Sequence, residues 1–154
     1  MTHTELVEIG YKWVLNKCAF AIKELVTHTN EQPDVIGFNA NGSFLLEAKT
    51  SRSDFLSDKK KPFRIVPSEG MGDWRFYIAP KGMIKIEELP TMWGLIEVNE
   101  KGKATCSYNP FGKGNIYSNW LRNDKCEGSE RIIMFSALRR LQKNKMINTI
   151  YKDK

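Results

Sequence analysis

Apolar residues recur at helical spacing along the first 28 residues of the chain. The repeating positions include Leu6, Ile9, Trp13, Ala21 and Leu25. Spacings of three and four residues predict one amphipathic helix over residues 4–28. The polar stretch behind it ends in Pro33, and proline both stops a helix and favours an extended conformation in the residue before it. We therefore expect this helix to be followed directly by a strand.

Two largely apolar runs, residues 34–38 and 43–49, enclose the sequence Asn-Ala-Asn-Gly at residues 39–42. Asn-Gly between two such runs is a strong signal for a tight turn between antiparallel strands. The pattern predicts a β-hairpin at the centre of the first half of the chain.

The rest of the chain alternates between strand-like and helix-like segments. Strands are expected over residues 74–79, 93–98 and 104–108, and a turn or short helix over 84–89. Helices are expected over residues 51–61, capped by Ser51 or Ser53, and over 129–145, capped by Ser129, with Ile133, Met134, Ala137, Leu138 and Leu141 facing inward. Residues 65–73 contain proline and glycine and are predicted to form a mobile loop, and residues 109–128 an irregular excursion. The pattern indicates a single α/β domain over residues 1–154 with a mixed β-sheet.

Composition agrees with one globular domain and adds a hint about partners. The 154 residues are 41% hydrophobic and 27% charged, which is typical of a folded soluble protein. Lys and Arg outnumber Asp and Glu by 24 to 18, giving a net charge of +6. A basic chain favours an anionic partner, with nucleic acid ahead of a membrane surface, although many basic proteins bind neither.

The cysteines and the hydropathy of the chain indicate in which cellular compartment the protein is expected. The three cysteines, Cys18, Cys106 and Cys126, are widely spaced and form no CxxC pair, so neither a disulfide framework nor a zinc site is indicated. No apolar stretch approaches the roughly 18 residues that a membrane span needs, and the first residues do not resemble a signal peptide. A cytoplasmic protein with no membrane partner is the expectation.

The predicted hairpin carries the residues with the clearest chemistry. Glu47 and Lys49 are two residues apart, so on a strand their side chains point to the same face. A two-residue turn would place Asp34 opposite Lys49 and a four-residue turn opposite Glu47, and both registers put the three side chains on one face, about 5–8 Å apart. Hydrolysis of a phosphodiester needs oxygen ligands for Mg²⁺ and a cation near the phosphate, and this set supplies both.

A less specific interpretation competes with this one. Exposed cross-strand ion clusters use the same residue types and contribute little. A second acid-x-Lys copy, Asp58-Lys59-Lys60, shows how easily the pattern arises, but it lies on a polar helix with no apolar strand before it. Context therefore separates the first copy from the second.

These residues resemble the PD-(D/E)XK nuclease superfamily, through Pro33-Asp34 and Glu47-Ala48-Lys49 behind a predicted helix that carries Glu24. The continuation at residues 50–60, TSRSDFLSDKK, looks like the branch that contains MmcB-like DNA-repair proteins and small phage-encoded relatives. The resemblance is clear over about residues 20–64 and looser over 76–82 and 93–98. It implies a restriction-endonuclease-like core with αβββαβ order, in which helices flank a mixed β-sheet. It also implies that the protein acts in a bacterial or phage-infected cell.

The resemblance also implies roles for single residues. Asp34, Glu47 and the backbone carbonyl of Ala48 would bind Mg²⁺ or Mn²⁺, and Lys49 would position or activate the attacking water. Glu24 would complete a second metal or water site, although a solvated helix glutamate would look the same.

The expected activity is metal-dependent hydrolysis of DNA, as an endonuclease rather than an exonuclease. Basic residues that would follow the phosphate backbone, or that form ordinary solvated faces, are Lys59, Lys60, Lys61, Arg64, Arg139, Arg140 and Lys143. Two alternatives stay open: a catalytically inactive nucleic-acid-binding or defence-related protein on the same fold, and a nuclease for RNA or branched DNA. A branched junction would require a symmetric homodimer.

Overall fold

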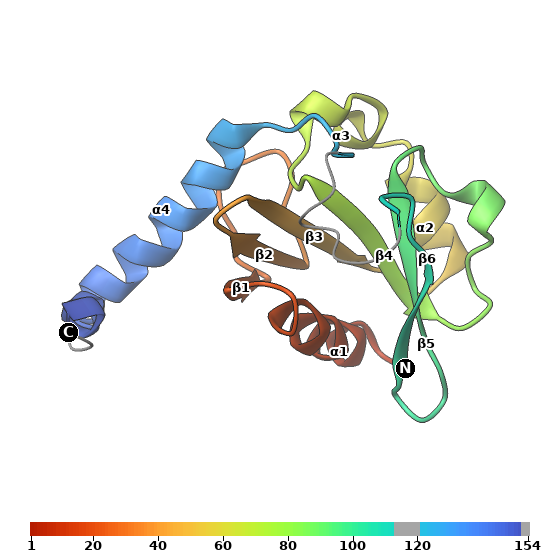
Figure 1. Ribbon diagram of the computed structural model, residues 1–154, viewed down its shortest axis with the longest axis horizontal. Helices are drawn as coiled ribbons and strands as arrows, with labels where there is room; N and C mark the ends of the chain where they lie inside the picture. Colours follow the sequence, from red (N-terminus) through yellow and green to blue (C-terminus); the bar gives the residue numbers. More distant parts are fainter. Residues whose placement is uncertain (113–120, 152–154) are drawn as a thin grey trace.

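A six-stranded mixed sheet forms the centre of the molecule, with the strands in the order β1-β2-β3-β4-β5-β6 (Figure 1). The computed structural model describes residues 1–112 and 121–151. The strands are β1 Phe20–Lys23, β2 Val35–Asn39, β3 Gly42–Ala48, β4 Trp74–Pro80, β5 Trp93–Val98 and β6 Ala104–Tyr108. Strands β3, β4 and β5 run parallel and the other neighbours antiparallel. The expected α/β class and mixed sheet are confirmed.

The first helix is shorter than the sequence pattern predicted. Helix α1 covers His3–Leu15 and starts with a capping box between Thr2 and Glu5. The segment expected to continue it is strand β1, which pairs antiparallel with β2, and the expectation of a helix to residue 28 is wrong. The side-chain amide of Asn39 fixes the turn between α1 and β1, because it donates to the carbonyl of Lys17 and accepts from the N–H of Ala19. A tertiary contact, rather than local spacing, therefore ends the helix.

The β2–β3 hairpin is confirmed, but its turn lies one residue earlier than the Asn-Gly signal suggests. Asn39 pairs with Gly42, so Ala40 and Asn41 form the two-residue turn and Gly42 begins β3. A Cβ at Gly42 would lie 2.6 Å from the Trp74 ring, so this glycine serves close packing.

The remaining helices that the sequence predicted are α2 Arg52–Asp58, η2 Ile86–Glu88 and α4 Glu127–Lys143. Three short helices that it did not predict are α3 Pro62–Ile65, η1 Pro67–Glu69 and η4 Ile147–Tyr151. Ser51 is the N-cap of α2, and its hydroxyl accepts from the N–H of Asp54 at 3.2 Å. The segment 65–73 is not a loose loop: Met71 is fully buried, and its N–H donates to Glu31. Of the predicted irregular excursion, residues 113–120 lie outside the described residues.

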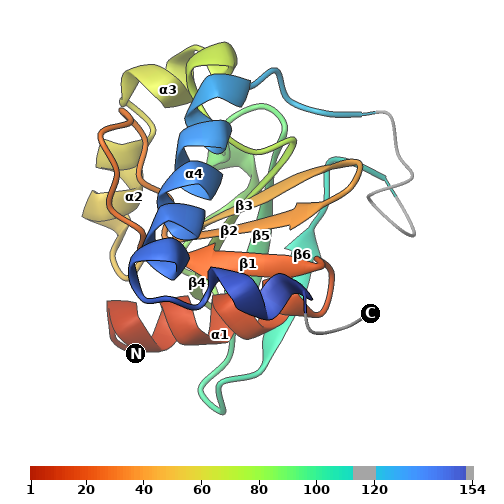
Figure 2. The same cartoon turned by 90° about the vertical axis from the view of Figure 1, so that its left-hand side faces the viewer.

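Helix α4 begins and ends two residues earlier than predicted, at Glu127 and Lys143 instead of residues 129 and 145. Cys126, not Ser129, is the N-cap residue. Ile133 is buried and Met134 and Ala137 pack partly against the core, as expected, but Leu138 is 51% exposed. Figure 1 shows the C-terminal part of α4 extending past the β1 edge of the sheet, and Figure 2 shows the molecule from that side.

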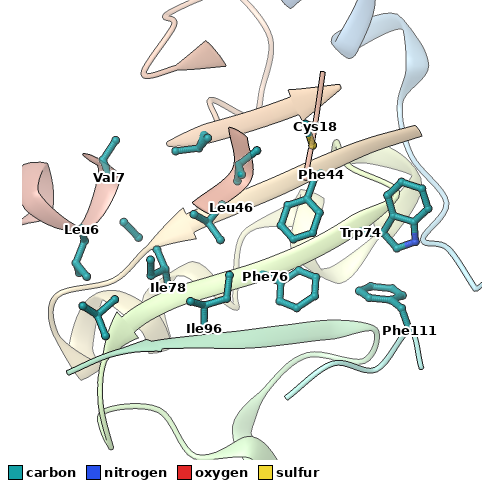
Figure 3. Close-up of a cluster of buried hydrophobic side chains, with 14 residues drawn as sticks. Leu6, Val7, Cys18, Phe44, Leu46, Trp74, Phe76, Ile78, Ile96 and Phe111 are labelled. Carbon is teal, nitrogen blue, oxygen red and sulfur yellow. The ribbon is translucent and has the colours of Figure 1, made fainter. Parts of the chain in front are cut away.

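Apolar side chains form one cluster on each face of the sheet. On one face, Leu6, Val7 and Val14 of α1 pack on Phe44 and Leu46 of β3 and on the β4 and β5 residues that Figure 3 shows. On the other face, a second cluster includes Phe55 of α2 and Ile133 of α4. Within the described residues, no helix is long and apolar enough to cross a membrane.

Candidate active site

Asp34, Glu47 and Lys49 meet where β2 begins and β3 ends. The register pairs Val35 with Leu46, which places Asp34 opposite Glu47, one of the two registers that the sequence allowed. The sequence linked this register to a four-residue turn, but it occurs with a two-residue turn, because the turn lies at Ala40 and Asn41 and not at Asn41 and Gly42. Asp34 is fixed in this position because its Oδ2 accepts a hydrogen bond from the N–H of Ala48 at 2.8 Å. The structure therefore brings together the three side chains that the sequence singled out.

Glu47 and Lys49 are both buried, so they are not an exposed surface pair. Each is 4% exposed, and Lys49 Nζ lies 3.5 Å from Glu47 Oε2. Burial raises the pKa of Glu47 to about 8, which Arg64 and Lys49 only partly oppose. The negative charge of Asp34, which lies opposite Glu47 in the hairpin, raises this pKa further. A carboxylate in such a place costs free energy unless a cation neutralises it.

Lys49 stays a cation in this environment. Burial by itself would lower the pKa of its ammonium, but Glu47 and Asp58 outweigh burial and the net direction is upward. Nζ also lies 3.3 Å from Asp58 Oδ1 and 3.9 Å from Asp54 Oδ2. A protonated lysine donates hydrogen bonds and attracts negative charge, so positioning a water or a phosphate is the role that this geometry allows.

Behind this pair lies a buried ion network that the sequence interpretation missed. Arg64 contacts Glu31, Asp58 through Nε at 2.8 Å, and Glu47 through Nη2 at 3.3 Å. Its guanidinium also stacks on the Trp93 ring, 4.6 Å from the centroid. Phe55 could have indicated that Asp58 is buried. It lies three residues before Asp58, so on a helix the two side chains share one face, and the apolar ring of Phe55 directs that face toward the core.

Glu24 reaches the site by a different route from the one expected. It follows β1 instead of lying on a helix, and its φ of 48° is in the left-handed region. Its N–H donates to the carbonyl of Asp34, and its carboxylate is 3.9 Å from His3 Nδ1. His3 Nε2 lies 3.3 Å from Asp34 Oδ1, so a histidine with no role in the sequence analysis lies at the mouth of the site.

The predicted nucleic-acid-binding residues divide into three groups. Arg64 is 6% exposed and its guanidinium is occupied by carboxylates, so it is not available to a phosphate. Lys61 is exposed but forms an ion pair with Asp58 at 2.7 Å. Lys59 is partly exposed, and Lys60, Arg139, Arg140 and Lys143 are exposed.

A second buried ion cluster, at the opposite ends of β3 and β4, provides a comparison. Asp73 accepts from the N–H of Ser43 at 2.8 Å, and Glu130 from the N–H of Gly72 at 2.9 Å. Lys125 joins the two carboxylates at 2.7 and 2.9 Å. This cluster fastens the start of α4 to the sheet, and its carboxylates are satisfied by backbone N–H groups, the Ser43 hydroxyl, Lys125 and Arg122.

The carboxylates of the candidate site are less well satisfied. In the part of the chain that the structure describes, Glu47 Oε1 and Asp58 Oδ1 are buried without a hydrogen bond of good geometry. No group of three or more His, Cys, Asp and Glu side chains within residues 1–112 and 121–151 is arranged as a metal site. Mg²⁺ commonly uses only one or two protein carboxylates and fills its coordination with water and substrate oxygens, so Asp34, Glu47 and one carbonyl fit its chemistry.

Comparison with known proteins identifies a shared fold. No family model and no curated protein matches the chain. The structure is similar to that of the SPO1766 protein of unknown function from Silicibacter pomeroyi, with a TM-score of 0.61 and 20% sequence identity. The match covers 92% of this chain and 90% of that one. At this identity the similarity shows the fold alone.

Proposed function

We propose that the chain is a metal-dependent nuclease with a restriction-endonuclease-like core, which hydrolyses phosphodiester bonds in DNA as an endonuclease. One observation carries the proposal: a buried Glu47–Lys49 pair lies beside Asp34, which is fixed by a backbone hydrogen bond. A buried carboxylate and lysine are costly, and perturbed groups of this kind concentrate at functional sites.

The burial of Glu47 supports a divalent cation at this site. Four carboxylates, from Glu31, Asp34, Glu47 and Asp58, surround the buried cations Lys49 and Arg64. The half-exposed Lys61 and the buried Arg75, which interacts with Glu31, add two further cations. Burial still disfavours the ionised form of Glu47, and Mg²⁺ or Mn²⁺ on Asp34, Glu47 and the Ala48 carbonyl would stabilise that form.

Within this proposal each side chain has a distinct task. When bound, the ion acidifies water and offsets charge that develops on the phosphate. Lys49, kept protonated by its carboxylate neighbours, orients the attacking water or a phosphate oxygen. Asp34 and Glu47 stay in place because a backbone N–H fixes the former and Arg64 contacts the latter. Glu24 and His3, both close to half exposed, would contact solvent-side ligands of the site.

The basic surface supports DNA as the partner. The net charge is +6, and the cations accessible to solvent include Lys59 and Lys60 just after α2 and Arg139, Arg140 and Lys143 on α4. Such residues would contact phosphates irrespective of sequence. A cytoplasmic location in a bacterial or phage-infected cell belongs to the same proposal.

The test compares cleavage of supercoiled, linear and single-stranded DNA in Mg²⁺, Mn²⁺ or EDTA. The native chain is compared with Lys49→Ala and Asp34→Asn, and the opposite cluster offers matched controls, Lys125→Ala and Asp73→Asn. We expect metal-dependent cutting that falls at least about 100-fold in the first pair, because positioned charges of this kind commonly contribute that much. The controls should lose stability but keep the cutting per folded molecule.

Absence of DNA cutting in every metal, with DNA binding intact, would refute the proposed DNA cleavage and favour the inactive binding protein or a nuclease for RNA. Cutting that is equal in all five proteins would place the activity elsewhere or assign it to a contaminant.

A second candidate, cleavage of branched DNA by a homodimer, is favoured by one feature of α4. Phe135 and Leu138, three residues apart on its outer face, are 60% and 51% exposed. Exposed apolar groups on one helix face favour self-association. Sedimentation of the native chain and of Phe135→Glu, together with cleavage of a four-way junction, distinguishes this candidate from a monomeric enzyme.

A further inference from the structure

Asp58 is a fully buried carboxylate that faces Lys49. It is the last residue of α2, and its exposed fraction is 0%. Its Oδ2 accepts hydrogen bonds from Arg64 Nε and from the Tyr77 hydroxyl, both at 2.8 Å. Its Oδ1 lies 3.3 Å from Lys49 Nζ and 2.7 Å from the half-exposed ammonium of Lys61. One oxygen is therefore fixed by two rigid partners, and this fixes the direction in which the other points.

Each partner of Asp58 is itself well anchored. Tyr77 lies on β4, and its ring stacks on Trp93 with centroids 4.4 Å apart. Arg64 has a side chain only 1% exposed and also contacts Glu31. Side chains that are already packed in place lose little further entropy when they hold a neighbour, whereas a free lysine side chain has many rotamers.

We propose that Asp58 is a positioning residue for Lys49, and that Tyr77 and Arg64 aim its carboxylate at the ammonium. Without it Lys49 would keep Glu47, at 3.5 Å, and the half-exposed Asp54, at 3.9 Å. Glu47 is also the carboxylate that a metal ion would engage, so it cannot by itself hold Lys49 in one place. This inference rests on the proposed function for its catalytic consequence, but not for the ordering of Lys49.

The first test measures the order of the Lys49 ammonium group, which does not depend on any activity. Nitrogen-15 NMR of lysine side chains reports whether an ammonium group is rigid or mobile. In the native chain the Lys49 order parameter should exceed that of exposed lysines such as Lys60. In Asp58→Asn it should fall toward the exposed value. Glu130→Gln is the matched control, because it removes a buried carboxylate from the opposite cluster and should leave Lys49 unchanged.

Removing a buried charge can prevent folding, so Tyr77→Phe is the second variant. It keeps the ring that stacks on Trp93 and removes one hydrogen bond to Asp58 Oδ2. A smaller loss of Lys49 order is expected. A rigid Lys49 in both variants, or an equal loss of order in Glu130→Gln, would overturn the inference.

The second test is a double-mutant cycle on DNA cleavage. Asp58→Asn should lower kcat by about 10–100-fold, the range usual for a residue that supports a site from behind, with KM within about twofold. Added to Lys49→Ala, it should cause no further loss, because Asp58 acts through Lys49. Additive losses would refute the coupling. If the native chain cleaves nothing while Asp58→Asn still mobilises Lys49, the proposed function fails and the positioning role stands.

Discussion

Replacement of Glu47 by glutamine should change how the stability of the protein depends on pH. Glu47 is 4% exposed, and burial raises its pKa to about 8. Glutamine has nearly the same shape and no charge, so it removes the titration while it keeps the volume. The effect of this titration on the free energy of unfolding should be absent at acidic pH, so the difference between the two proteins should grow as the pH rises.

The magnitude follows from the proton that Glu47 retains on folding. The unfolded chain loses this proton near its ordinary pKa of 4.5, whereas the folded chain keeps it up to about pH 8. The folded state then binds more protons than the unfolded state, so the native chain loses stability as the pH rises through this window. At about 1.4 kcal/mol per pH unit, the loss is at most about 5 kcal/mol by pH 8. The stabilisation is complete below pH 4.5.

Urea unfolding between pH 4.5 and 9, followed by tryptophan fluorescence, measures the difference between the two free energies of unfolding. The exposed Glu87→Gln variant is the control, and its difference from the native chain should stay constant. Mg²⁺ at pH 8 should restore stability to the native chain and not to Glu47→Gln, because metal binding requires the ionised carboxylate. A difference that does not change with pH would refute the reasoning about burial.

Three further substitutions test local features of the fold and the site. Glu24→Gly should leave the free energy of unfolding nearly unchanged, because glycine tolerates the positive φ at this position. The control Ala21→Gly, within β1, should lower it by about 0.5–1 kcal/mol. Equal losses of both variants in urea unfolding would contradict a strained backbone at Glu24. Gly94→Ala should lower the free energy of unfolding by about 1–3 kcal/mol, because its Cβ would lie 2.8 Å from the backbone oxygen of Tyr108. The control Gly128→Ala meets no such contact and should not lower it. A native melting temperature in both variants would refute the close approach at Gly94. Ser51→Ala should cost about 1 kcal/mol through loss of the α2 cap and Ser53→Ala less than about 0.5 kcal/mol, and the reverse order in urea unfolding would assign the cap to Ser53.

Local sequence determined the β2–β3 hairpin and the shared face of Glu47 and Lys49 on it. Alternation within β2 and β3 places Glu47 and Lys49 on one face whatever the turn, since side chains in a strand repeat every two residues. The Ser51 cap and the positions of strands β4 to β6 followed from equally local signals. The parallel pairing that makes the sheet mixed joins residues about 20–30 positions apart, such as Phe44 with Trp74.

Tertiary structure alone decided the features that depend on distant partners. Residues 20–23 have a spacing compatible with a helix, but the free edge of β2 offered backbone hydrogen bonds and made them β1. Glu24 therefore reached the site from a strand end and His3 from a helix start, positions that no local pattern indicates. The same holds for Arg64, which the sequence placed on the surface because it follows three lysines. It is buried because Glu31, Asp58 and Glu47 converge on it from separate segments, and a buried cation is stable only where such partners meet.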